Sequence, residues 1–307
     1  MVVAGGVLMA AVLMVATVSW FVRSEREDVA QLVVMNVDGS GRRTIAGQSG
    51  LEYWGPAWSP DGGQLVFSLF PRDPAAQADS PASLWIATVD DGEMRQLTDG
   101  DGGWLPDWSP DGLHIAFLAP AGENDTQEVF SIGSDGQGLT RLTNNSAEEY
   151  GVSWSPDGRE IAFGSTQDGT WQIYVMKADG SEMRRLETGG GNAPAWSRDG
   201  QFIVFNSDRQ GPGDVFVLEL GTGVVRQLTH EKSRFDGLPS WSPDGSRIAF
   251  MSFRDGRSDI YMMDNDGGAV VNLTNTPGLG EAVPAWSPDG SRIAFHSRPP
   301  GARAPVR

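Results

Sequence analysis

The ionisable residues of this 307-residue chain include few of the combinations on which enzyme active sites depend. There is no cysteine, which excludes disulfides, thiolate metal sites and cysteine nucleophiles. The three histidines, His114, His230 and His296, show no paired ligand spacing. The chain also lacks the Gly-x-Ser-x-Gly elbow of serine hydrolases. We therefore expect no catalytic residue, no metal site, no cofactor and no enzymatic activity.

Acidic residues that recur along the chain are interpreted as turn residues. One aspartate stands in each of six copies of a Trp-Ser-Pro-Asp-Gly motif, where Ser, Pro, Asp and Gly are typical of a type I turn: Asp61, Asp111, Asp157, Asp199, Asp244 and Asp289. The run Asp264 to Gly267 resembles the start of a calcium loop, but the twelfth position holds Asn275 in place of the bidentate glutamate. We interpret that run as a hairpin turn.

Acidic and aromatic residues just before each motif vary from copy to copy, so they are better candidates for a specific function. The candidates are Glu52, Trp54, Asp101, Trp104, Glu148, Glu149, Tyr150, Asp236 and Glu281. The fourth copy has only the run 189–192 at this place. We hypothesise an acidic rim with aromatics on one side, which fits a cationic or peptide-like ligand. The alternative is that these side chains only close and solvate a channel mouth.

The repeated motif predicts the strands that position these residues. The motif copies start at Trp58, Trp108, Trp154, Trp196, Trp241 and Trp286, at spacings of 50, 46, 42, 45 and 45 residues. Each copy leads into an apolar triplet that ends in phenylalanine, as in Leu65 to Phe67, which predicts two short strands joined by a tight turn. A second hairpin with a Gly-containing turn follows in five units. Four short strands per 45 residues are typical of a propeller blade.

The two ends of the repeat predict how the ring closes. Residues Leu32 to Ile45 match the second hairpin alone, and residues Pro284 to Ser297 match the first hairpin alone. Joining them gives a sixth blade and removes the free sheet edges. We therefore predict an all-β, six-bladed β-propeller over residues 31–298 with split-blade closure.

The repeated W-S-P-D-G-x-x-I-A-F followed by I-Y-x-M-x-x-D-G resembles the WD-like repeat of the TolB-type propellers, and the resemblance covers Leu32 to Ser297. It implies the fold, and it implies a function only loosely, because one fold carries many functions. TolB itself is a periplasmic protein that binds partner proteins at its channel mouth. Related propellers serve as sensor domains behind a membrane helix or as lids on prolyl oligopeptidases. The resemblance therefore implies an extracytoplasmic binding platform.

The N-terminal residues form an apolar run from Val2 to Val22 that is long enough to span a bilayer. We expect residues 1–23 to be a transmembrane anchor, with a cleaved signal segment as the alternative. Residues 24–30 would be a linker and residues 299–307 a disordered tail. The predicted location is the cell membrane, with a single pass and the propeller outside the cytoplasm, although Arg23 and Arg26 after the run favour the opposite orientation.

The charge balance of the chain limits the classes of partner that it can be expected to bind. With 23 Lys and Arg against 40 Asp and Glu, the net charge is −17, and no Lys/Arg-rich stretch stands out. We therefore do not expect nucleic acid as a partner, because binding to phosphates needs a basic face. We expect a monomer that binds a protein or peptide-like ligand, acting as an interaction or sensory platform. The alternatives are a propeller-fold enzyme, such as a polysaccharide lyase or glycan hydrolase, and a fragment of a larger sensor kinase or peptidase.

Overall fold

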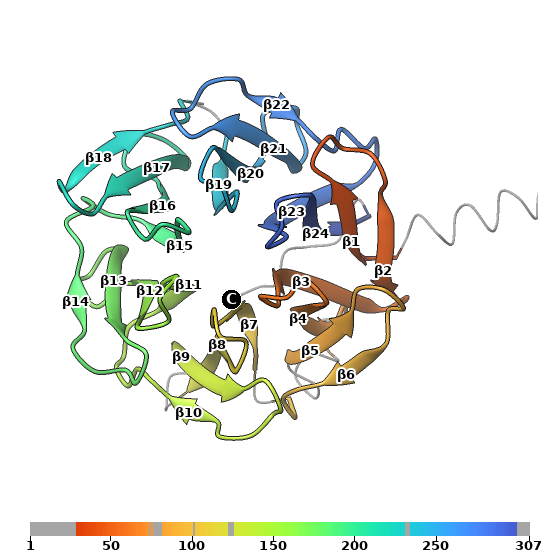
Figure 1. Ribbon diagram of the computed structural model, residues 1–307, viewed down its shortest axis with the longest axis horizontal. Coiled ribbons are helices and arrows are strands. Elements are labelled where there is room, and N and C mark those ends of the chain that lie inside the picture. The colour runs from red at the N-terminus through yellow and green to blue at the C-terminus, as the bar shows by residue number, and fades with distance from the viewer. Residues whose placement is uncertain are drawn as a thin grey trace, which may run out of the picture.

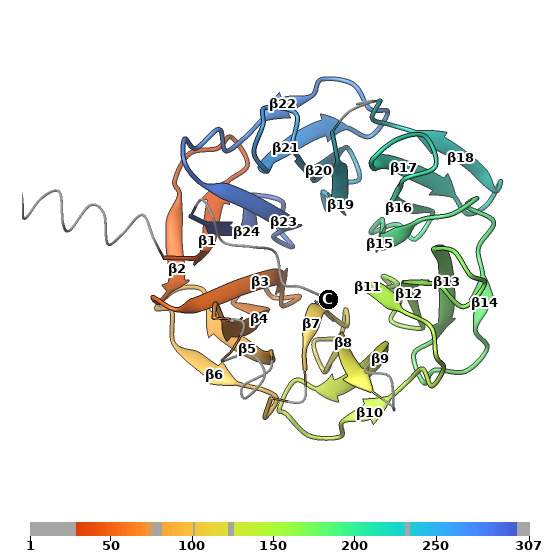
Figure 2. The ribbon, with the colours of Figure 1, turned by 180° about the vertical axis from the view of Figure 1, so that it is seen from behind.

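The computed structural model describes residues 29–73, 75, 82–100, 102–121, 126–230 and 234–299. In this part of the chain 24 strands form six four-stranded antiparallel sheets, arranged as blades around a central axis (Figures 1 and 2). The six-bladed all-β propeller predicted from the repeat is confirmed. The apolar run 2–22 lies outside the described residues, and within them no helix is long and apolar enough to cross a membrane.

Each blade runs from an innermost strand at the axis to an outermost strand. The innermost strands are β3 (Leu51–Trp58), β7 (Trp104–Trp108), β11 (Glu149–Trp154), β15 (Asn192–Trp196), β19 (Asp236–Trp241) and β23 (Gly280–Trp286). The second strands are β4 (Gln64–Pro71), β8 (His114–Ala121), β12 (Glu160–Ser165), β16 (Phe202–Ser207), β20 (Arg247–Ser252) and β24 (Arg292–Arg298). The third strands are β5 (Ser83–Thr88), β9 (Thr126–Gly133), β13 (Gln172–Lys177), β17 (Asp214–Glu219), β21 (Asp259–Asp264) and β1 (Gln31–Asn36). The outermost strands are β6 (Met94–Gln96), β10 (Thr140–Arg141), β14 (Arg184–Arg185), β18 (Val224–Gln227), β22 (Val271–Asn272) and β2 (Arg43–Gly47).

The last blade is assembled from both ends of the chain. Strand β1 pairs antiparallel with β24 over six residues, from Gln31 opposite Ser297 to Asn36 opposite Arg292. The sheet order is therefore β2-β1-β24-β23, and the red and blue ribbons lie side by side in Figure 1. The predicted split-blade closure is confirmed.

The hydrophobic core lies between the blades. In β4, Leu65 and Phe67 pack with Leu32 of the neighbouring split blade, whereas Val66 packs with Phe117 of the next blade. Successive residues of a strand point to opposite faces of the sheet, so both faces of each blade are covered by its neighbours. This explains why the second strands carry continuous apolar triplets where a half-exposed strand would alternate.

The Trp-Ser-Pro-Asp-Gly segments are tight turns. In each copy the serine hydroxyl donates to the aspartate Oδ1 at 2.5–2.7 Å. In the first copy Ser59 also accepts from the backbone N–H of Gln64, and Gly62 has a φ of +73°, which favours glycine. Hydrogen bonding from Ser59 holds the pKa of Asp61 below its usual value. These contacts confirm that the repeated aspartates are turn residues.

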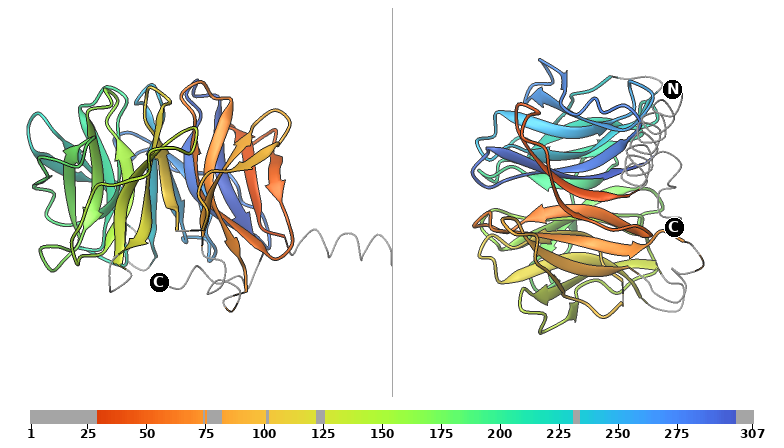
Figure 3. Two further views of the ribbon diagram at one scale, coloured as in Figure 1. Left: turned by 90° about the horizontal axis from the view of Figure 1, so that it is seen from below. Right: turned by 90° about the vertical axis from the view of Figure 1, so that its right-hand side faces the viewer.

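The two ends of the propeller are distinguished by their loops. We call the end with the six Trp-Ser-Pro-Asp-Gly turns the turn face, and the end where the innermost strands begin the entry face. Strand β1 begins and β24 ends at the entry face, because Gln31 pairs with Ser297 and Arg298 pairs with Gly280 (Figure 3). The described chain thus enters and leaves the propeller on the same face.

Candidate functional site

The candidate residues at the entry face are largely packed into the propeller. Glu52, Glu149, Asp236 and Glu281 are buried, and Glu148 is exposed. Of the three aromatics, Trp54, Trp104 and Tyr150 are each half-buried. Asp101 lies outside the described residues.

Three of the four buried carboxylates are paired with arginines. Glu52 accepts from Arg72 Nε at 2.7 Å, and Asp236 from Arg254 Nη2 at 2.8 Å. Burial raises the pKa of Asp236, although Arg254 opposes the shift. Each arginine belongs to the same blade as its carboxylate, so these two pairs link two segments of one blade at the entry face.

The third pair joins the two ends of the chain. Glu281 of β23 is paired with Arg42, whose second Nη also donates to Ser297 at 3.0 Å, and the guanidinium lies over the Phe295 ring. In the preceding blade the guanidinium of Arg254 lies over the corresponding phenylalanine ring, that of Phe250. The residue at the position of Arg254 in the last blade is Pro299. Arg42 thus replaces a missing arginine from the other half of the split blade.

Glu149 is held without an arginine. Its carboxylate accepts from Thr143 Oγ1 at 2.6 Å, from Asn145 Nδ2 at 2.9 Å and from the Val129 N–H at 3.0 Å. Burial raises the pKa of Glu149 to about 7, against the lowering effect of these hydrogen bonds.

The three aromatics of the entry face each pack against a different partner. Trp54 stacks on His296 with ring centroids 4.1 Å apart, Trp104 packs on Phe70 at 4.7 Å, and Tyr150 meets Trp171 edge-on at 6.2 Å. A binding role for the entry face stays a prediction.

A cavity of about 540 Å³ occupies the turn-face half of the channel. Its walls repeat six times, because each innermost strand contributes the same positions before its tryptophan. The position two residues before the tryptophan is proline in five blades: Pro56, Pro106, Pro194, Pro239 and Pro284. Proline has no N–H to leave unpaired on a sheet edge that faces the channel.

The deepest ring of the cavity is formed by β-bulges. The residue three before each tryptophan has a positive φ, between 47° and 68°: Gly55, Leu105, Gly151, Ala193, Leu238 and Val283. The pairing register of every innermost strand shifts at this point. Such a conformation costs a β-branched residue such as Val283 on the order of 1 kcal/mol. The bulge turns the ring residues toward the axis in all six blades.

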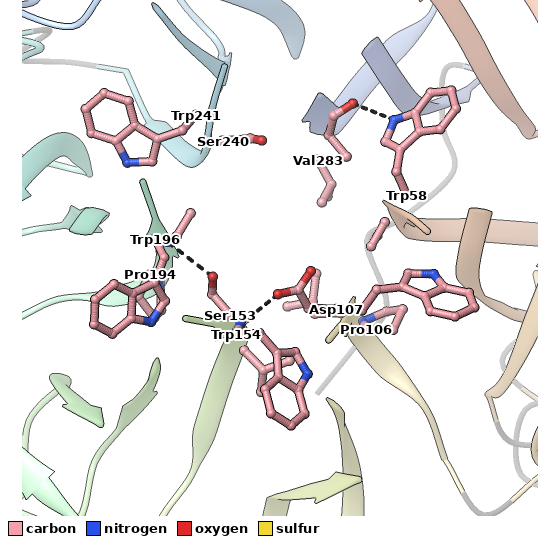
Figure 4. Close-up of a pocket in the computed structure, with 18 of the residues that line it drawn as sticks. Trp58, Pro106, Asp107, Ser153, Trp154, Pro194, Trp196, Ser240, Trp241 and Val283 are labelled. Atoms are coloured by element: carbon pink, nitrogen blue, oxygen red, sulfur yellow. Dashed lines mark hydrogen bonds between the residues drawn. The ribbon is translucent and has the colours of Figure 1, made fainter. Parts of the chain in front are cut away.

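Asp107 brings a carboxylate into a wall built of proline, tryptophan, small apolar residues and serines (Figure 4). Its Oδ2 accepts from the backbone N–H of Trp154 in the next blade at 2.8 Å. Ser153 accepts in the same way from the N–H of Trp196 at 3.2 Å. Desolvation raises the pKa of Asp107 to about 7, although the backbone hydrogen bonds oppose the shift.

Arg198 marks the outer end of the cavity. It replaces the proline of the turn motif in the fourth blade, is exposed, and donates from Nη1 to the carbonyl oxygen of Pro288 in the sixth blade at 2.9 Å. Among the described residues that line the cavity, Asp107 and Arg198 are the two ionisable ones. Neither was among the residues that we selected from the sequence, but both break the repeat, since the other blades hold alanine or serine at the first position and proline at the second.

Comparisons with known proteins agree with the architecture. The family model for the TolB beta propeller domain matches residues 16–193 and 187–304. The Tol-Pal system protein TolB of Geobacter sulfurreducens is 41% identical over 66 residues, which is 22% of this chain and 15% of that protein. An uncharacterized peptidase of Bacillus subtilis, YuxL, is 31% identical over 162 residues, 39% of this chain and 24% of the peptidase. The chain therefore matches less than a quarter of the length of either relative.

A solved structure shows the same fold over nearly the whole propeller. The structure of a provisionally assigned TolB from Agrobacterium tumefaciens superposes with a TM-score of 0.70 at 24% identity, covering 88% of this chain and 98% of the other.

Proposed function

Because the chain belongs to the TolB beta propeller family, we propose that it is a membrane-anchored, extracytoplasmic binding platform that takes a protein partner at its channel. The observation that supports this role best is the cavity at the turn face, which is lined by proline and tryptophan and contains one carboxylate. Apolar cavities with a few placed polar groups are the usual form of ligand sites.

Binding is proposed here in place of catalysis. General acid–base or nucleophilic chemistry needs two or more groups in contact, such as a base beside a nucleophile. Asp107 and Arg198 are the ionisable groups of the cavity within the described residues, and Arg198 is bonded to the Pro288 carbonyl. This arrangement favours recognition of a ligand over its chemical conversion.

The turn face is the surface that we propose for the partner. The described chain enters at Val29 on the entry face, so an anchor formed by residues 1–23 would lie on that side. The turn face and its cavity would then point away from the membrane. The eight described residues among those selected from the sequence remain the alternative contact surface, at the entry face.

Site-specific photo-crosslinking in cells tests the proposed function. A photo-reactive amino acid replaces Arg198 at the turn face, Glu148 at the entry face, or Val224 on the outer strand β18, all three exposed. We expect one discrete protein adduct from position 198 and none from the control position 224. An adduct from position 148 alone would place the partner on the entry face. No adduct at either face would contradict the proposed platform role.

A further inference from the structure

Asp107 is a half-buried carboxylate whose partners in the described part of the chain are backbone N–H groups. Its Oδ2 is used by the Trp154 N–H, and Figure 4 shows its carboxylate inside the ring of tryptophans. No ion pair to it is formed among the described residues. A desolvated carboxylate without a counter-charge is unfavourable unless a ligand supplies one.

The surroundings of Asp107 limit the shape of that ligand. The wall beside Asp107 is apolar at Pro106, with tryptophans at the rim, and the hydroxyl of Ser153 in the next blade lines the same cavity. A fitting ligand therefore carries its positive charge at the end of a slim apolar stem.

We propose that this cavity receives a lysine side chain of a partner protein, with the ammonium group against Asp107 and the methylene stem along the proline and tryptophan walls. This assignment rests on the platform role proposed above. Lysine is a compact charge on a flexible four-carbon stem, and such stems pack readily on apolar surfaces. Arginine fits less well, because its planar fork favours a carboxylate with both oxygens available, and Oδ2 of Asp107 is already occupied.

The proposal carries a pH dependence with a defined sign. The Asp107 carboxyl, with a pKa of about 7, is ionised above neutral pH and protonated below it. A lysine stays charged over this range, and so does Arg198, the other ionisable group of the described cavity wall. Lysine binding is therefore strong at pH 8 and weakens as the pH falls through 7.

The test measures peptide binding to the full chain in detergent micelles through the change in tryptophan fluorescence, to which the five tryptophans of the cavity wall contribute. The probes are acetyl-Gly-Lys-Gly-amide, the same peptide with norleucine or arginine in the middle, and Gly-norleucine-Gly-amide with a free amino terminus. We expect the lysine peptide to bind at least about tenfold more tightly than the other three at pH 8, the loss typical of a charge-assisted hydrogen bond. Its affinity should fall at least about tenfold at pH 5.5.

Two substitutions of Asp107 distinguish the effect of losing its charge from the effect of disturbing the fold. Asp107→Asn keeps the shape, and Asp107→Ser copies Ser153, which keeps an acceptor for the next tryptophan N–H. Both should remove the preference for lysine and the pH dependence. The control Glu93→Gln removes one exposed negative charge outside the cavity wall and should change neither.

Three outcomes would overturn the lysine assignment: equal binding of the norleucine peptide, equal or tighter binding of the arginine peptide, or tighter binding through the free amino terminus. The platform role is judged separately by the crosslink from position 198. If that adduct persists in the Asp107→Asn background while the peptides show no preference, the lysine assignment falls and the platform role stands.

Discussion

At the scale of single residues, the turn-face cavity differs from its own repeat at two positions. The residue before the tryptophan is alanine or serine in five blades and Asp107 in the second, and the turn proline is replaced by Arg198 in the fourth. A repeat that closes on itself needs neither change for packing. Such substitutions make the wall of a symmetrical channel asymmetric, because they place ionisable side chains in single blades. A ligand can then bind in one orientation.

The charge of Asp107 should lower the stability of the protein at alkaline pH. Its pKa of about 7 in the folded state lies above the ordinary value near 3.9, so the folded state binds the extra proton between these values. Stability is therefore gained as the pH falls and lost as it rises through 7. We expect Asp107→Asn to raise the free energy of unfolding by about 1–2 kcal/mol at pH 8.5 and by much less at pH 5. Urea denaturation at both pH values measures this, and an equal gain at both would contradict it.

His296 should act in the opposite direction. The ring is buried against Trp54, neither nitrogen has a hydrogen-bond partner among the described residues, and burial lowers its pKa well below 6.5. Below pH 6.5 the unfolded chain takes up a proton that the folded chain does not, so stability falls by up to about 1.4 kcal/mol per pH unit.

The matched substitution is His296→Leu, because Leu118 stands at the equivalent position of the second blade. We expect the acid-side loss of stability between pH 6.5 and 5 to be smaller in the variant than in the parent protein. Thermal melting across this range provides the comparison. Parallel pH profiles would show that the histidine is not the titrating group.

At the scale of elements, the innermost strands are defined by their bulges. The same backbone irregularity occurs in all six, yet only two of the six residues are glycine. Gly151 is one of these two glycines, and its position leaves no room for a side chain: a Cβ there would lie 2.7 Å from the Cα of Ala193 in the next blade. The bulge thus belongs to the fold, whereas the glycine is required by the close approach of a neighbouring strand.

The bulge glycine should be less tolerant than a turn glycine of the same conformation. Gly245 has a φ of +70°, close to the +68° of Gly151, but a Cβ there would meet nothing within 4 Å. We expect Gly245→Ala to cost about 1 kcal/mol from backbone conformation alone, and Gly151→Ala to cost about 2 kcal/mol or more. Chemical denaturation of the two variants tests this, and equal losses would disprove the steric contribution.

At the scale of the whole molecule, ring closure is reinforced by contacts between residues far apart in sequence. The β1–β24 ladder supplies the backbone pairing, and Arg42 supplies the counter-charge of Glu281, 239 residues away along the chain. Because Glu281 is fully buried, removing the arginine leaves a charge without compensation.

Loss of this arginine should therefore weaken the closure of the ring. We expect Arg42→Ala to lower the free energy of unfolding by about 2–3 kcal/mol, less than for a fully buried pair because Arg42 is 29% exposed. The control Lys177→Ala breaks the exposed pair with Glu182 and should cost less than about 1 kcal/mol. Equal effects of the two substitutions would mean that the split blade does not depend on this pair.

The sequence by itself determined the six blades, their hairpin turns and the closure between the chain ends. These features follow from turn residues and apolar triplets that act over a few residues and recur six times, so each copy confirms the others. The tertiary structure alone decided which charged groups have partners. Glu52, Asp236 and Glu281 are paired with arginines, while Asp107 faces a cavity without one, because burial and partner distance depend on how neighbouring blades and distant segments pack around the axis.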